Sequence, residues 1–169
     1  LSVAQINQFD WGLKFRTGYG GLASGQIPTQ TIAADTNGSV IMADVATSNF
    51  TIGNTFIPLT GLNGTMFTTK IDKTGNTEWL HLSPPTDGGY GWPRPYGIDI
   101  DNKGSAYIVG DAFSNTVVFH GVTISGPIGD AFAIKVNSDG ALDWANMLTG
   151  QQRGTVMTSD LMEWSVAGI

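Results

Sequence analysis

The sequence predicts an all-β protein built from a repeated unit of short antiparallel strands. One block of sequence occurs twice, as MFTTKIDKTGNTEW from Met66 and as AFAIKVNSDGALDW from Ala131, 65 residues later. Upstream, IAADTNGS from Ile32 is matched by IDIDNKGS from Ile98, 66 residues later. Two blocks that recur at nearly the same spacing define a repeat unit, and a repeat indicates the architecture before any single residue does.

The composition supports many strands joined by turns. The 169 residues include 23 glycines, and only 13% are charged, against about 25% in typical globular proteins. The net charge of −6 argues against nucleic acids and anionic membranes as partners, because both attract basic surfaces. The chain has no cysteine, which excludes disulfides and thiolate metal sites. No apolar run approaches the roughly 20 residues of a membrane span, so membrane insertion is not expected.

The second unit, expected over residues 96–150, shows the order of elements most clearly. Its predicted strands are 96–101, 106–111, a hairpin over 116–124 that turns at His120-Gly121, 131–137 and 142–148. Turns at 102–104 and 138–140 separate the strands, because Asn tolerates left-handed geometry and Gly supplies positive φ. Each unit is therefore predicted to be a four-stranded antiparallel meander with a hairpin inserted between its second and third strands.

The first unit, expected over residues 29–83, repeats this order, and residues 84–95 connect it to the second. Its predicted strands are 30–35, 40–45, a hairpin over 50–59, 66–72 and 77–82. Within residues 1–28, Asp10-Trp11 repeats the acid-Trp pair of each last strand, so this segment is interpreted as the last strand of a preceding unit plus a connector. Residues 151–169 are interpreted as the start of a third unit.

The distribution of large and small residues predicts β-propeller blades. In the third strand of the second unit, Phe132, Ile134 and Val136 share one face, while Ala131 and Ala133 share the other. A four-stranded sheet cannot bury both faces alone, so such units stack on one another. Three units are too few for a ring of about four to eight blades. We therefore expect the chain to be a fragment of a longer array, or part of a ring that is closed in a dimer.

Lysine recurs in the third strand of both units, at Lys70 and Lys135. We expect each to reach a blade edge, or to pair with a carboxylate on the adjacent strand, such as Glu78 or Asp143. Both interpretations give these lysines a structural role.

A more specific pattern runs through the second unit. It consists of a Phe-x-Gly-x-x-Ile hairpin (Phe119, Gly121, Ile124) followed by Asp130, Ala131, Phe132, Lys135, Gly140, Trp144 and Gly150. This pattern resembles the bacterial seven-bladed beta-propeller repeat, abbreviated SBBP. The first unit departs from it, because Gly64-Thr65-Met66 replaces Gly-Asp-Ala and no Gly follows Leu82 until Gly88.

The resemblance covers about residues 30–150 and implies architecture more than activity. Similar repeats occur in long secreted or cell-surface proteins, notably of Bacteroidetes-type bacteria, which implies adhesion, surface assembly or ligand display. The opening residues also resemble the end of a signal peptide, with Ser2 and Ala4 as the small residues beside the cut, although a plain N-terminal strand is the alternative. We therefore expect an exported protein, secreted or on the cell surface.

The connectors between units hold the candidate ligand-binding residues. Residues 17–28 and 84–96 both contain Gly-Tyr-Gly, and in a propeller such loops gather on one face. Aromatic rings there could stack on sugars or anchor a protein partner. Alternatively, they pack over the blade ends. The candidates are Tyr19, Tyr90, Trp92, Arg94 and Tyr96.

Neither a catalytic nor a metal-binding residue is expected. His81 and His120 are the only histidines and lack a second ligand at metal-site spacing. Asp35 and Asp101 precede turns that lack the further oxygens of a calcium loop. The two aspartates and the two histidines are therefore interpreted as structural, and no cofactor is expected.

These observations predict a non-catalytic scaffold or adhesion segment that contacts proteins or glycans at the cell surface. Further blades of the same chain, or a homo-oligomer, would complete the ring. One alternative is a carbohydrate-binding module that uses the connector aromatics. Another is a non-catalytic part of a larger secreted enzyme.

Overall fold

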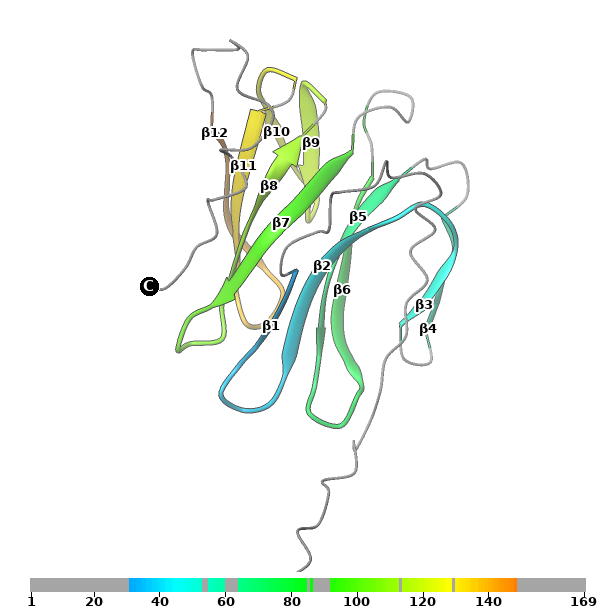
Figure 1. Cartoon of the computed structure of the whole chain (residues 1–169), viewed down its shortest axis with the longest axis vertical. Helices are drawn as coiled ribbons and strands as arrows, with labels where there is room; N and C mark the ends of the chain where they lie inside the picture. Colours follow the sequence, from blue (N-terminus) through cyan, green and yellow to red (C-terminus); the bar gives the residue numbers. More distant parts are fainter. Residues whose placement is uncertain are drawn as a thin grey trace, which may run out of the picture.

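The protein is all-β in the part of the chain that its computed structural model describes, residues 31–52, 55–59, 64–84, 86, 92–112, 114–128 and 130–148 (Figure 1). The strands are, in chain order, β1 (Ile32–Ala34), β2 (Val40–Ala46), β3 (Phe50–Ile52), β4 (Thr55–Ile57), β5 (Thr65–Ile71), β6 (Thr77–Ser83), β7 (Pro93–Ile100), β8 (Ala106–Ala112), β9 (Thr116–Phe119), β10 (Val122–Ser125), β11 (Asp130–Val136) and β12 (Leu142–Leu148). The residues in these ranges form no helix, and hence none that could cross a membrane.

The strands form two four-stranded antiparallel sheets and two hairpins. Sheet 1 has the order β1-β2-β5-β6, and sheet 2 has the order β7-β8-β11-β12. The hairpin β3–β4 lies between the second and third strands of sheet 1 in sequence, and β9–β10 does the same in sheet 2. This order confirms the all-β prediction and the meander with an inserted hairpin.

Strand β7 begins at Pro93, inside the segment 84–95 that the sequence suggested as a connector. It is an edge strand of sheet 2, where proline is tolerated because one side of the strand needs no ladder hydrogen bonds. Its pairing with β8 shifts between Pro95 and Gly97 at a bulge. The bulge places Tyr96 next to the paired positions of β7 without a partner of its own on β8.

The two sheets repeat the same strand register. The pairing of β5 with β6 shifts between Lys70 and Ile71, and the pairing of β11 with β12 shifts at the corresponding place, next to Lys135. As a result, Trp79 lies opposite Lys70 in sheet 1, and Trp144 lies opposite Lys135 in sheet 2. The sequence repeat is therefore also a structural repeat, in which both sheets have the same strand pairing and the same position of the bulge.

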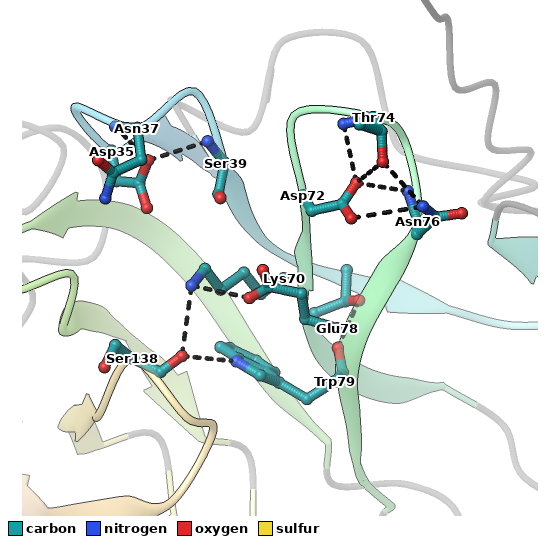
Figure 2. A network of polar contacts seen from close by, with 11 residues as sticks. Asp35, Asn37, Ser39, Lys70, Asp72, Thr74, Asn76, Glu78, Trp79 and Ser138 are labelled. Carbon is teal, nitrogen blue, oxygen red and sulfur yellow. Dashed lines mark hydrogen bonds and ion pairs between the residues drawn. The ribbon is translucent and has the colours of Figure 1, made fainter.

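Four hairpin turns of one kind connect the main strands, at residues 35–39, 72–76, 101–105 and 137–141. In each turn the backbone N–H of the first residue donates to the carbonyl of the fifth, and the fourth residue is a glycine with φ between 80° and 89°. In the first three turns an Asp carboxylate also accepts the backbone N–H groups of the third and fifth residues. Figure 2 shows these contacts for Asp35 and Asp72. These contacts confirm that Asp35 and Asp101 are turn residues.

The sheets stack face to face, with β7 beside β1 and β2 (Figure 1). We call their interface the seam. Sheet 1 contributes one face to the seam, with Ile41, Ala43, Val45, Met66, Thr68, Lys70, Trp79 and His81 at alternate positions of β2, β5 and β6. Sheet 2 contributes Ala106, Ile108, Ala112, Phe132, Ile134 and Val136 to the same core.

The stacking is head to tail, because the two sheets turn equivalent faces in the same direction. The far face of sheet 1 carries Met42, Phe67 and Ile71, which form a second core with the hairpin β3–β4. In the repeat these three residues correspond to Ile108, Phe132 and Val136, which sheet 2 turns toward the seam. A symmetric sandwich would instead bring equivalent faces together.

Each inserted hairpin packs on its own sheet through a pair of phenylalanines. Phe50 of β3 lies against Phe67 with ring centroids 4.9 Å apart, and Phe119 of β9 lies against Phe132 at 4.8 Å. All four rings are buried. The hairpin is thus part of the core of each repeat rather than a loop laid over it.

Candidate functional site

At one end of the seam, polar side chains of sheet 1 donate to one backbone carbonyl of sheet 2 (Figure 2). We call this the polar end of the seam. The carbonyl of Ser138, in the turn between β11 and β12, accepts the Trp79 indole N–H at 3.2 Å and the Lys70 ammonium at 3.4 Å. Lys70 also forms an ion pair of 2.8 Å with Glu78. Because the Lys70 side chain is only 10% exposed, its charge depends on these oxygens for compensation.

The same turn lies flat against the Trp79 ring at Gly140. A Cβ placed on Gly140 would lie 2.8 Å from Trp79 Cγ and 3.1 Å from His81 Nε2. Gly140 also has φ of +88°, which disfavours any residue with a side chain. Glycine is therefore required here both by the turn and by the neighbouring sheet.

Two histidines from different sheets stack beside this turn. His81 of β6 and His120, at the tip of β9–β10, have ring centroids 3.9 Å apart and an interplanar angle of 21°. His120 Nδ1 lies 3.0 Å from the carbonyl of Gly140, and its Nε2 lies 2.9 Å from Thr68 Oγ1. A carbonyl can only accept, so Nδ1 carries the proton, and Nε2 of the neutral ring accepts from the Thr68 hydroxyl.

This surrounding keeps both rings uncharged. Burial, with a smaller contribution from the neighbouring His81, lowers the pKa of His120 from an ordinary value of 6.5 to about 4. Burial likewise lowers the pKa of His81. Near neutral pH the seam is therefore closed by two neutral stacked rings, which suits a structural role for both histidines.

The structure separates the candidate ligand-binding residues. Tyr19 and Tyr90 lie outside the described residues. Trp92 packs against the core of the seam, and a Cβ on Gly64 would lie 2.6 Å from its indole. Its ring N–H is buried and has no hydrogen-bond partner among the described residues. The indole of Trp92 therefore points into the protein.

Arg94 and Tyr96, by contrast, meet at Asp111. Arg94 Nε donates to one carboxylate oxygen of Asp111 at 3.2 Å, and the Tyr96 hydroxyl donates to the other at 2.8 Å. Burial raises the pKa of Asp111, although the charge of Arg94 opposes the shift. Asp111 lies opposite Ala131, and both point away from the seam because their neighbours Ala112 and Phe132 point into it.

Arg94, Tyr96 and Asp111 thus belong to the outer face of sheet 2, the face turned away from sheet 1. Its other members are Tyr107, Val109, Ala131, Ala133, Lys135, Trp144, Asn146 and Leu148. Three large side chains on this face are substantially exposed: Tyr96 at 42%, Trp144 at 38% and Leu148 at 54%. Two of these three exposed side chains are aromatic.

At one end of the outer face, equivalent side chains are arranged like those at the polar end of the seam. Lys135 pairs with Asp143 at 2.9 Å, as Lys70 pairs with Glu78, which confirms the carboxylate pairing predicted for both lysines. The Trp144 ring meets Tyr107 edge to face at 6.2 Å, and the Lys135 ammonium lies 5.6 Å from the Tyr107 ring centroid. The tryptophan and lysine of sheet 1 that bind Ser138 thus have counterparts in sheet 2, of which Trp144 is exposed and Lys135 is partly buried.

Among the described residues, no group of three or more His, Cys, Asp or Glu side chains is placed to hold a metal ion. In comparisons with known proteins, the chain matches no protein-family model and no curated protein sequence.

We expect Gly140→Ala to lower the free energy of unfolding by about 2–4 kcal/mol in urea denaturation, through a strained backbone and a methyl group forced onto Trp79. Gly121→Ala is the matched control, since Gly121 also has positive φ, of 83°, but no atom lies within 4 Å of an added Cβ. It should cost only about 1 kcal/mol. Equal losses in the two variants would contradict the contact between the turn and the indole.

We also expect the protein to lose stability as the pH falls from 6.5 to about 4. In this range the unfolded chain binds a proton on His120 that the folded chain excludes, so the free energy of unfolding decreases with falling pH. His120→Asn should flatten this dependence, because Asn tolerates the left-handed φ of 50° and does not titrate. Urea midpoints above pH 6.5 and near pH 4 test this, and an unchanged slope in His120→Asn would refute it.

Proposed function

We propose that the chain is a non-catalytic stacking segment of a β-propeller in an exported protein, and that it serves as a scaffold for protein or glycan contacts at the cell surface. The observation that carries the proposal is the head-to-tail seam between two equivalent sheets. A stack of this kind is extended by adding further units in the same orientation, either from the same chain or from another copy. A propeller is a closed form of such a stack.

The use of the unusual polar groups supports a scaffold rather than an enzyme. His120 closes the seam between Thr68 and Gly140. The pKa of Asp101 is lowered mainly by the backbone N–H of Ser105, within its own turn. The pKa of Asp72 is lowered in the same way, mainly by the Thr74 hydroxyl. These three groups, whose pKa values are displaced, thus hold two turns and the seam together.

The location rests on the sequence. The resemblance to the SBBP repeat favours export, because similar repeats occur in secreted or cell-surface proteins. The repeated residues serve packing between sheets, so contacts with other molecules fall to the surfaces that the stack leaves open.

A glycan-binding module is the second candidate, and the outer face of sheet 2 is the observation that favours it. Tyr96, Tyr107 and Trp144 share this face with the ion pair of Arg94 and Asp111, and aromatic rings beside polar groups suit the faces and hydroxyls of sugars. Glycan-array binding that is lost on Tyr96→Ala would favour this function over the scaffold.

Native-state hydrogen exchange tests the scaffold proposal. The slowest amides of β5 and β11 should exchange with the same opening free energy, because the seam makes the two sheets one cooperative unit. Trp79→Ala should separate the two values, whereas Trp144→Ala, its counterpart outside the seam, should leave them equal. Opening free energies that already differ in the unmodified chain would contradict a stacked scaffold.

A further inference from the structure

We propose that the outer face of sheet 2 binds the far face of sheet 1 of a second copy of this chain, so that copies join head to tail and repeat the seam between molecules. This inference rests on the stacking function proposed above and names its partner. Its basis is that Trp144 and Ile32, which are 38% and 51% exposed at the two ends of the stack, are the counterparts of Trp79 and Ile98, which pack against the core of the seam.

The middle of the outer face has the shape that sheet stacking requires. In the seam, sheet 1 presents Ala43 and Thr68, which are 0% and 2% exposed. Their counterparts at the centre of the outer face are Val109 and Ala133, which lie opposite each other on β8 and β11. Neither side chain is larger than valine, so another sheet can approach closely at this place.

The polar end of the outer face has the donors that the seam uses. Trp144 and Lys135 occupy the positions of Trp79 and Lys70, on the same side of an equivalent bulge. In the seam these two donors converge on the Ser138 carbonyl. The residue that corresponds to Ser138 in sheet 1 is Lys73, so the Lys73 carbonyl of a second copy is the matching acceptor.

The turn of sheet 1 also matches in shape. It runs over residues 72–76 with the hydrogen bonds of the turn at 137–141, and Gly75 has φ of 89° at the position of Gly140. Gly75 of a second copy can therefore lie flat against the Trp144 ring, as Gly140 lies against Trp79. This pairing would cover the exposed indole.

The apolar edge of sheet 1 completes the match. Ile32 of β1 is 51% exposed, whereas its counterpart Ile98 of β7 packs against the core of the seam. Both hold the same place in their sheets, since Ile32 lies opposite Met42 and Ile98 lies opposite Ile108. In a second copy, Ile32 would therefore enter the new interface as Ile98 enters the seam.

Such an interface joins two different surfaces, so it is heterologous. Each copy carries both surfaces, and association continues past the dimer unless the assembly closes into a ring. An interface that paired the outer face with itself would stop at a symmetric dimer. The two arrangements can therefore be separated by blocking one surface at a time.

Sedimentation velocity of the full chain, whose mass is 17.9 kDa, tests the proposal. We expect species larger than the monomer to grow with concentration. Trp144→Ala, which alters the outer face of sheet 2, and Ile32→Asp, which alters the far face of sheet 1, should each be monomeric alone. An equimolar mixture should form a dimer and nothing larger, because each variant retains the surface that the other lacks.

Val122→Asp is the matched control, since Val122 is 48% exposed on the inserted hairpin and has no place in the proposed interface. It should associate like the unmodified chain, and circular dichroism should show the same strand signal in all variants. A monomeric unmodified chain, association unaffected by Trp144→Ala, or a mixture that stays monomeric would overturn the proposal. If β5 and β11 still opened together in a monomeric chain, the inference would fail while the stacked scaffold stood.

Discussion

The contact between the turn at residues 137–141 and Trp79 is the constraint on which the arrangement of the two sheets depends. This turn brings the Ser138 carbonyl to two donors of sheet 1, and it brings the Gly140 carbonyl to His120. A side chain at Gly140 would push the turn off the indole. Because the turn is the rigid end of β11 and β12, its position also sets how the apolar face of sheet 2 lies on sheet 1.

Much of the fold is predictable from the sequence, because the features involved are local and occur twice. Strand order follows from alternating apolar residues, and the turns follow from an Asp or Asn with a glycine three residues later. Pairs such as Lys70 with Glu78 are predictable once the strands on either side of a turn are known, since the register follows from the turn. The repeat supports each assignment, because the same pattern of residues occurs in both units.

The parts that depend on contacts between units are not predictable in this way. The stacking of His81 on His120 joins residues of different sheets, and no spacing in the sequence signals it. Trp92 and Tyr96 lie close in sequence and looked alike as connector aromatics. The indole of Trp92 packs closely over Gly64, in the core. The bulge in β7 instead places Tyr96 beside Asp111. A single sequence does not encode such choices locally, because they result from the packing of one sheet on another.

The seam also explains why the surfaces at the ends of the stack are of functional interest, since their residues repeat those that the seam buries. The most direct test of the seam is the proton NMR spectrum of the chain in solution. If the turn lies on the indole, the α protons of Gly140 will show nuclear Overhauser effects to the Trp79 ring and an upfield ring-current shift. Ordinary chemical shifts for these protons, with no Overhauser effect to the indole, would contradict the stacked arrangement of the two sheets.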